Sequence, residues 1–367
     1  MPHESATISL SARFFRFESF PPARCYYHTT LNHPLKASSV TPSRIATKLL
    51  VLIGTTALLA AVALAGIIAF GTSSLPQPLP DADAPFKKVD FHDLPPLQSF
   101  RARDGVALAY RVYPGHGNKA VVMLHGAAAS SFMLHVLAKA VQASGFTVYV
   151  QDLRGHGASG GNGDIAYNGQ LQDDVADFAR FVHRAQPSAS LSLLGHSAGG
   201  GLALRFAGGP DGALFGRYVL LSPMLARDAT TVRPDVGGFA KPFKARYVGL
   251  TTLDRLGVHG FEALPVLAFA VPAAPGNMMT PLYSYRLSEN FTQDTHYLDD
   301  LRHIARPTEL LVGADDEFFY ADKFAPLVHG VRPDIPVSIV PKVGHTGIIL
   351  DPAAIQQVIA VLGRDHG

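Results

Sequence analysis

The sequence predicts an α/β protein with a mostly parallel, doubly wound sheet, helices on both faces of that sheet, an inserted helical cap and an N-terminal transmembrane helix. Three observations lead to this prediction. Short apolar runs alternate with segments of helical periodicity from residue 120 to residue 362, the stretch 223–305 interrupts this alternation, and residues 49–70 form one uncharged apolar run. Continuous apolar strands separated by helices are typical of parallel strands that are buried on both faces.

The alternating region defines the expected sheet. Strands are predicted at 120–124, 147–150, 191–194, 218–221, 309–312 and 336–340, and helices at 131–144, 169–185, 352–362 and from Ser197 onward. Residues 100–113, with Asp104-Gly105 at their centre, predict an antiparallel hairpin that leads into the sheet. The interruption at about 223–305 is rich in proline, glycine and aromatic residues. Because it is too long for a loop, we predict a helical cap there.

The apolar run at 49–70 predicts a membrane anchor. Its 22 residues carry no charge, and about 20 apolar residues are enough to cross a bilayer as a helix. Arg44 and Lys48 precede it, which places the N-terminus in the cytoplasm and the body on the extracytoplasmic, periplasmic side. The expected organisation is a disordered basic segment at 1–48, the transmembrane signal anchor at 49–70, a Pro-rich linker at 71–94 and the folded domain at 95–367.

Other interpretations of this run stay open. Ala63-Leu64-Ala65 has the small-residue pattern of a signal-peptidase site, and cleavage there would give a secreted protein. The apolar run continues to Phe70, which favours the anchor. A buried core helix is the third interpretation, and the Pro-rich stretch after the run argues against it. The pattern of basic and then apolar residues begins only at Arg44, so the first 40 or so residues could precede the functional start.

Composition excludes several classes of function. From residue 49 onward the chain carries 25 basic and 27 acidic residues, so nothing indicates nucleic-acid binding. The one cysteine is Cys25, so the body has neither a disulfide nor a thiol nucleophile. No HExxH pattern is present, and we expect no metal and no cofactor. The GHGASG sequence at 155–160 fits G-x-G-x-x-G, but the loop continues to Asp164 where a dinucleotide site needs a helix.

The sequence GHSAG at 195–199 indicates a nucleophile. It matches G-x-S-x-G and lies between a predicted strand and a predicted helix, as that motif requires. The sharp turn lifts the serine hydroxyl above the sheet, and small flanking residues let strand and helix approach closely. We therefore predict Ser197 as the nucleophile.

A serine nucleophile needs a base and an acid that orients the base. His345 follows the last predicted strand and precedes the last predicted helix, so we predict it as the base. Asp315 and Asp316 follow the strand at 309–312, and either could be the acid. The backbone N–H groups of Ala198 and of Ala127, in the turn after the first parallel strand, are the predicted oxyanion donors. His125 in the same turn is expected to be a structural hydrogen-bonding residue.

The chain resembles the α/β-hydrolase superfamily, and within it the monoacylglycerol lipase/lysophospholipase and serine aminopeptidase group. The resemblance is carried by LHG at 124–126, DLRGHGAS at 152–159, GHSAG at 195–199, GADD at 313–316 and GH at 344–345. It implies that Asp316 rather than Asp315 is the acid, and that the loop at 154–159 is a structural signature. The cap shares no motif with the group, and the chain has no HGGG turn.

These features predict a serine hydrolase that cleaves a carboxylic ester through an acyl-enzyme on Ser197. The substrate is expected to be a small ester or lipid, such as a monoacylglycerol or lysophospholipid. The apolar segment 261–279 could line an acyl pocket or simply be cap core. The alternative is an aminopeptidase or amidase with the same triad, which would need an acidic group in the cap, for which Glu262 or Glu289 is available. A tethered binding module without activity is disfavoured because all three catalytic roles are filled.

Overall fold

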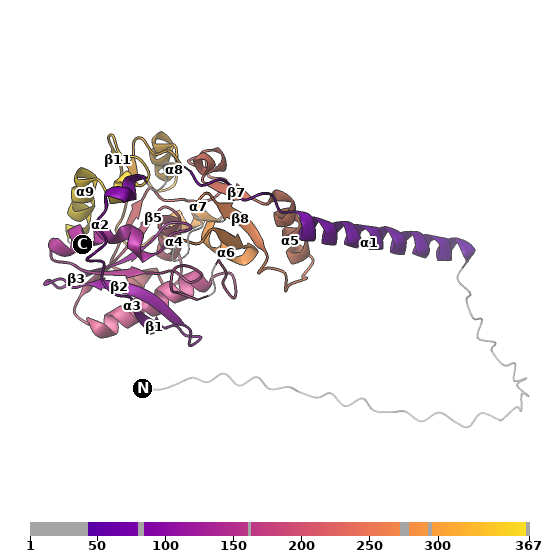
Figure 1. The fold of residues 1–367 in the computed structure, drawn as a ribbon, viewed down its shortest axis with the longest axis horizontal. Helices are drawn as coiled ribbons and strands as arrows, with labels where there is room; N and C mark the ends of the chain where they lie inside the picture. Colours follow the sequence, from indigo (N-terminus) through magenta and orange to yellow (C-terminus); the bar gives the residue numbers. More distant parts are fainter. Residues whose placement is uncertain (1–42, 80–83, 161–162, 272–278, 293–295, 365–367) are drawn as a thin grey trace, which may run out of the picture. The chain divides into compact units, whose positions relative to one another are not determined.

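The computed structural model describes residues 43–79, 84–160, 163–271, 279–292 and 296–364 (Figure 1). The chain divides into two units, residues 1–56 and 57–367, with the boundary inside helix α1 (Arg44–Phe70). Most of the segment predicted to be disordered, residues 1–42, lies outside the described residues.

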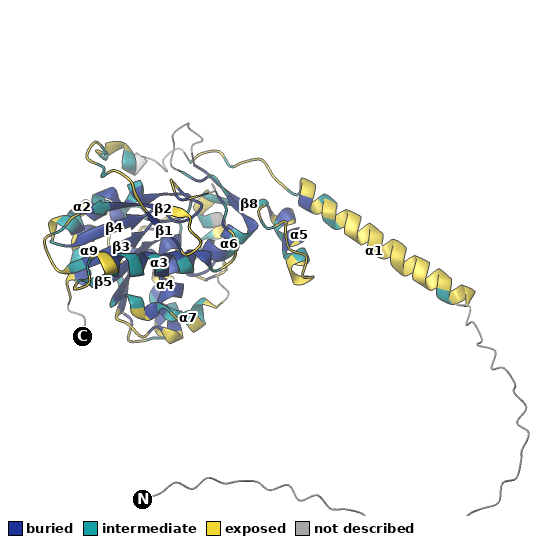
Figure 2. Ribbon diagram, turned by 90° about the horizontal axis from the view of Figure 1, so that it is seen from below, coloured by how far each residue is buried: buried dark blue, intermediate teal, exposed yellow. Residues whose placement is uncertain are grey.

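Helix α1 is the apolar run of the sequence. It begins at Arg44, five residues earlier than the predicted span, so the two basic residues belong to the helix. Its residues are apolar from Leu49 to Phe70 apart from Thr55 and Thr56, and Ile68 is its one buried residue. Figure 2 accordingly shows most of α1 as exposed. By length and composition α1 is a candidate membrane span, although an N-terminal signal sequence has the same properties.

The second unit is built on an eight-stranded sheet with the strand order β1-β2-β4-β3-β5-β6-β10-β11. The strands are β1 (Gln98–Arg101), β2 (Ala107–Tyr113), β3 (Lys119–Leu124), β4 (Thr147–Gln151), β5 (Ser190–His196), β6 (Arg217–Leu221), β10 (Thr308–Gly313) and β11 (Val337–Val340). The predicted hairpin is β1 and β2, which pair antiparallel with each other, as β2 does with β4. All remaining neighbours are parallel, as predicted.

Helices cover both faces of this sheet because alternate strand residues point to opposite sides. Val121 and Met123 belong to one core cluster, together with α2 and α9 residues, whereas Val122 and Leu124 belong to the other, together with α3 and α4 residues. The covering helices are α2 (His135–Ala143), α3 (Gln170–Ala185), α4 (Ala198–Gly208), α8 (Phe324–His329) and α9 (Pro352–Gly363). Every predicted strand and helix of the sheet region is present, within a few residues of its predicted ends.

The segment predicted as a cap forms the elements between β6 and β10. It contains the helices α5 (Lys244–Arg255), α6 (Tyr285–Thr292) and α7 (Tyr297–His303). It also contains a small antiparallel sheet that the sequence did not predict, made of β7 (Ala240–Pro242), β8 (Pro265–Phe269) and β9 (Leu282–Ser284). Two of these strands are only three residues long, too short for an alternating pattern to be recognised.

The segment predicted as a linker has defined contacts in its described parts. Lys241 Nζ donates to Ser74 O at 2.8 Å, and the Leu79 N–H donates to Ala270 O at 3.2 Å. Asp93 accepts hydrogen bonds from His135 Nε2, at 3.0 Å, and from Lys139 Nζ. These contacts attach residues upstream of position 95 to the cap and to α2.

Candidate active site

Ser197 lies at the turn between β5 and α4. Its backbone has φ +57° and ψ −122°, a conformation that is strained for any residue with a side chain. The Ser197 N–H donates to Leu221 O at 2.9 Å, and Ser197 O accepts from the Met224 N–H at 2.9 Å. These bonds to the end of β6 and beyond hold the strained turn in place.

The glycines of the GHSAG motif allow this turn to form. A Cβ on Gly195 would come within 2.2 Å of Gly199 O, so the strand and the helix meet backbone to backbone. A Cβ on Gly199 would come within 2.4 Å of His125 O, in the turn after β3. Both glycines are therefore required by close packing around Ser197, as the motif predicts.

His345 and Asp316 are joined by a buried hydrogen bond. His345 Nδ1 lies 2.9 Å from Asp316 Oδ2, and both side chains are at most 3% exposed. Asp316 Oδ1 accepts the backbone N–H groups of Phe318 and Phe319, each at 2.9 Å. Burial raises the pKa of Asp316, but the His345 imidazole and these donated hydrogen bonds outweigh it and leave the pKa below its ordinary value. The neighbouring Asp315 is exposed.

The surroundings of His345 fix its backbone and its ring. Glu317 Oε2 accepts the His345 N–H at 2.8 Å, and the ring centroids of Phe318 and Phe319 lie 4.5 and 5.1 Å from that of His345. His196 Nε2 donates to His345 O at 3.1 Å, and burial lowers the pKa of His196 to about 3, so this imidazole is neutral. No sequence motif marks these residues, although three of them directly follow Asp316.

His196, the neighbour of Ser197 in the chain, connects the serine turn to the His345–Asp316 pair. His196 precedes Ser197, and its ring centroid lies 4.8 Å from that of His345. In the described part of the chain, Ser197 Oγ forms no hydrogen bond with His345. Hydrogen bonds between a nucleophile and its base are often long or misaligned until a substrate binds.

The turn after β3 lies against Ser197. A Cβ on Gly126 would come within 3.0 Å of Ser197 Cβ. Among the described residues, the N–H groups of Ala127 and Ala198 have no acceptor. Ala198 is the first residue of α4, where backbone N–H groups lack an intrahelical partner. Both N–H groups are therefore available as hydrogen-bond donors.

The cap holds this turn through Tyr283 of β9. Ala128, which has φ +58°, donates its N–H to the Tyr283 hydroxyl at 2.6 Å and accepts the Thr280 N–H at 2.9 Å. The Tyr283 hydroxyl also lies 2.5 Å from His156 Nε2 and donates to it, because His156 Nδ1 donates to Arg154 O. Tyr283 is fully buried. Nothing in its local sequence marks it, so only the fold could reveal this contact.

The remaining motif residues have structural partners. His125 Nδ1 donates to Gly126 O at 2.8 Å and Nε2 accepts the Leu153 N–H at 3.1 Å, which fits the expected structural role. Arg154 binds both carboxylate oxygens of Asp174 at 2.8 Å each. Gly155 in the G-x-G-x-x-G sequence has φ +80°, and the next helix begins only at Gln170, so no helix follows the motif directly.

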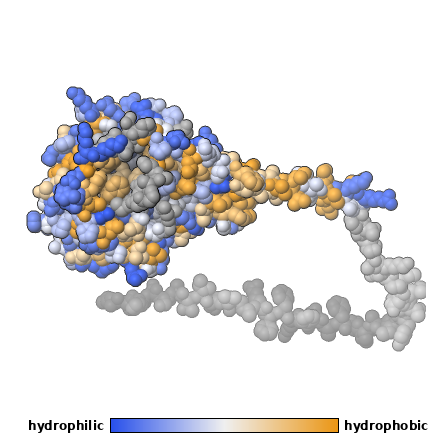
Figure 3. Space-filling view, viewed as in Figure 1, coloured by the Kyte–Doolittle hydropathy of each residue, from blue (hydrophilic) through white to orange (hydrophobic). Residues whose placement is uncertain are grey.

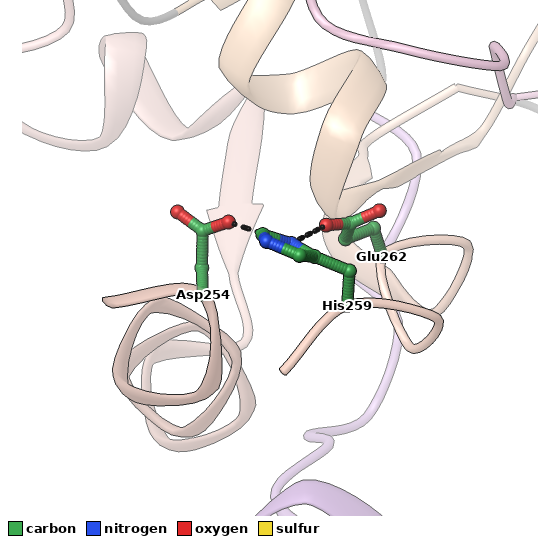
Figure 4. A group of neighbouring side chains, drawn as sticks. All are labelled: Asp254, His259 and Glu262. Atoms are coloured by element: carbon green, nitrogen blue, oxygen red, sulfur yellow. Dashed lines mark hydrogen bonds and ion pairs between the residues drawn. The ribbon is translucent and has the colours of Figure 1, made fainter. Parts of the chain in front are cut away.

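A second group of chemically active side chains lies on the cap. His259 Nδ1 lies 2.8 Å from Glu262 Oε1 and 3.4 Å from Asp254 Oδ1 (Figure 4). Although their ligand atoms lie within 4.8 Å of one another, these residues already pair with each other at the cap surface. Glu289, the other acidic cap residue considered for an amine substrate, accepts the Tyr247 hydroxyl at 2.7 Å.

A cavity of about 310 Å³ lies at the opposite edge of the main sheet. Its lining includes Arg217, Thr308 and Pro336, at or just before the amino ends of β6, β10 and β11. Ser197, by contrast, follows the carboxyl end of β5, and parallel strands place all their carboxyl ends at one edge. The cavity therefore does not belong to the candidate active site.

The sheet order, the strained serine turn and the buried histidine–aspartate pair define an α/β-hydrolase. A family model described as "Serine aminopeptidase, S33" (Hydrolase_4) matches residues 115–346, well over half of the chain, and the protein belongs to this family of hydrolases.

Two relatives show partial similarity. The chain is 36% identical over 113 residues to a monoacylglycerol lipase from Mycolicibacterium smegmatis (strain ATCC 700084 / mc(2)155), covering 29% of this chain and 40% of the relative. It is 31% identical over 157 residues to the AB hydrolase superfamily protein YisY from Bacillus subtilis (strain 168), covering 40% and 55%. The matched segments thus span about half the length of these relatives or less.

Solved structures share the fold. A soluble variant of monoglyceride lipase from Saccharomyces cerevisiae in complex with a substrate analogue has a TM-score of 0.57 at 16% identity and covers 75% of this chain and 97% of the other. An esterase from Pyrococcus furiosus has a TM-score of 0.50 at 17% identity and covers 76% and 97%. At these identities the similarity establishes the α/β-hydrolase fold alone.

Proposed function

We propose that this protein is a serine ester hydrolase with Ser197 as nucleophile, His345 as base and Asp316 as the acid that orients the base. The observation that carries the proposal is the buried His345–Asp316 hydrogen bond next to a serine in a strained turn. Membership of a hydrolase family and the partial similarity to a monoacylglycerol lipase support it. Of the two aspartates, only Asp316 is buried and bonded to His345.

In the proposed reaction, Ser197 Oγ attacks the ester carbonyl carbon while His345 Nε2 takes the hydroxyl proton. Asp316 accepts the Nδ1–H of His345 and stabilises the imidazolium that forms. The N–H groups of Ala127 and Ala198 bind the oxyanion. The intermediate collapses to an acyl-enzyme as the alcohol leaves with the proton from His345. Water, deprotonated by His345, then attacks the acyl carbon and releases the carboxylic acid and the free Ser197 hydroxyl.

We further propose that the substrate is a small lipid ester of the monoacylglycerol type and that α1 anchors the enzyme in the membrane. The mycobacterial relative supports this substrate class. The exposed, uncharged stretch 49–70 of α1 supports the anchor. Arg44 and Lys48 lie at the N-terminal end of the helix, which places the main body on the extracytoplasmic side. An aminopeptidase is the second candidate, favoured by the family description. Against it, Glu262 and Glu289 already have partners in the cap.

A substrate comparison tests this assignment. We expect the purified full chain to release fatty acid from monoacylglycerols and to hydrolyse p-nitrophenyl esters of the same acyl chains. Aminoacyl anilides, assayed on the same preparation, should turn over at least 100-fold more slowly. Faster cleavage of the anilides than of the esters would replace the esterase assignment with a peptidase.

Replacing Tyr283 with Phe should lower kcat, because the hydroxyl positions the turn that carries the proposed oxyanion donor Ala127. The variant leaves the buried Ala128 N–H without its acceptor, beside a backbone already at φ +58°. Loss of one oxyanion donor lowers kcat by about 10²–10³-fold. A donor that is only shifted should lower kcat less, on the order of 10-fold. Initial rates on a p-nitrophenyl ester would show a reduced kcat with KM nearly unchanged.

Tyr218→Phe is the matched control. Tyr218 is also fully buried, and its hydroxyl donates one hydrogen bond, to Gly212 O at 2.8 Å, away from the candidate site. The Tyr218→Phe variant should lower the melting temperature about as much as Tyr283→Phe does, while leaving kcat unchanged. Equal kcat values for both variants would show that Tyr283 has only a structural role.

A further inference from the structure

The cap exposes four large apolar side chains on α5 and the loop that follows it. The exposed fractions are 61% for Val248, 68% for Leu256, 44% for Val258 and 50% for Phe261. We call these four residues the α5 surface. Such side chains are normal when scattered singly, but a group on one helix and its adjoining loop indicates a contact partner.

The α5 surface belongs to the helix that holds the end of α1. Arg246 of α5 is buried and donates from Nε to Ile68 O at 2.8 Å and from a terminal nitrogen to Ala69 O at 3.0 Å. A Cβ on Gly249 would come within 2.7 Å of Ile68 Cγ1, so the two helices touch at that point. The last carbonyls of a helix lack intrahelical donors, and a cation there also offsets the helix dipole. All these residues lie in the second unit of the chain.

We propose that the α5 surface inserts into the lipid bilayer at the point where α1 leaves it, so that the cap rests on the membrane. This inference rests on the membrane anchoring proposed for α1. Residues 49–70 span roughly 33 Å as a helix, close to the thickness of the hydrocarbon core. The membrane surface therefore lies near Phe70, and α5 is bonded to Ile68 and Ala69 at the same level.

The loop that carries most of the α5 surface has a defined shape. His259 pairs with Asp254, near the end of α5, and with Glu262, at the far end of the loop (Figure 4). Gly257 and Gly260, at φ +72° and +112°, provide the bends between them. The apolar side chains are thus presented by an ordered loop and need little ordering on insertion.

Two basic side chains and the hydropathy of this region fit a lipid surface. Lys244 and Arg255 are exposed on α5, where their long side chains can reach lipid phosphates while apolar neighbours enter the acyl region. Figure 3 shows apolar residues gathered on α1 and on the adjoining part of the body. The cap also holds the Ala128 turn beside Ser197. A cap in contact with the membrane would therefore bring the candidate active site close to amphiphilic esters in the bilayer.

Tryptophan fluorescence tests this contact, since the chain contains no tryptophan. We would reconstitute full-length Phe261→Trp into phosphatidylcholine vesicles with and without bromine on the acyl chains near the headgroup. Brominated lipid should quench its emission at least twofold. Ile339→Trp, on the edge strand β11 of the main sheet where Ile339 is 40% exposed, should be unaffected.

Leu256→Asp separates docking from catalysis. It should reduce hydrolysis of a long-chain monoacylglycerol embedded in vesicles at least fivefold and leave hydrolysis of a soluble butyryl ester unchanged. Unquenched Phe261→Trp emission in protein that floats with the vesicles would overturn the docking alone. Emission that is blue-shifted but insensitive to bromine would also overturn it and assign the α5 surface to a second copy of the chain. If the unmodified enzyme failed to hydrolyse the soluble butyryl ester, that result would instead contradict the proposed hydrolase function.

Discussion

Ser197→Ala should reduce kcat for p-nitrophenyl esters by about 10⁴–10⁶-fold, the range seen when a triad nucleophile is removed. Without Oγ no acyl-enzyme can form, and only the oxyanion donors and substrate binding remain to accelerate attack by water. The fold should survive, because the strained turn is held by backbone bonds from Ser197 to Leu221 and Met224 that alanine retains. Steady-state rates and the burst of p-nitrophenol in the first turnover would measure the loss.

Ser192→Ala provides a control for the Ser197 substitution. Ser192 is a buried serine in β5, the strand that leads into the Ser197 turn, five residues before the nucleophile. Its replacement should leave kcat within about twofold of the unmodified enzyme. If Ser197→Ala retained full esterase activity and the burst, another residue would have to be the nucleophile, and the proposed mechanism would fail.

The main sheet could be predicted from sequence because its strands are buried on both faces. Each such strand is a short apolar run, and the helices between them have a different period, so both are visible in one sequence. The candidate catalytic residues follow from the same pattern, since Ser197, Asp316 and His345 each come within five residues of the end of a predicted strand. The structure brings Asp316 and His345 within 2.9 Å of each other from segments 29 residues apart.

The cap could not be predicted in the same detail. Its strands β7 and β9 are three residues long and are stabilised by pairing with β8. Pairing between strands leaves no periodic pattern in the sequence of such short segments. Tyr283 lies 155 residues from Ala128, so the hydrogen bond between them exists only in the folded chain. The apolar composition of segment 261–279 does not distinguish a pocket lining from cap core. Its strand β8 is packed as cap core, Phe261 is exposed, and residues 272–278 lie outside the described residues.

Asp316→Asn should reduce kcat by about 10³–10⁴-fold, the second largest effect that we expect. The asparagine amide can still accept the N–H groups of Phe318 and Phe319, so the loop should keep its shape. Its NH₂ group would then face His345 Nδ1 and could only donate. His345 would be held with its proton on Nε2, toward the serine, where it cannot act as a base. Initial rates on a p-nitrophenyl ester across a range of pH would measure the fall of the plateau.

Asp315→Asn is the matched control, because it makes the same chemical change one residue away. Asp315 is exposed, and its backbone N–H, which the substitution retains, bonds to Val343 O at 3.0 Å. Its kcat should stay within about twofold of the unmodified enzyme. The sequence alone left these two aspartates equivalent, and family resemblance favoured Asp316. A larger loss in Asp315→Asn than in Asp316→Asn would mean that the buried pair is structural and that the acid of the triad lies elsewhere.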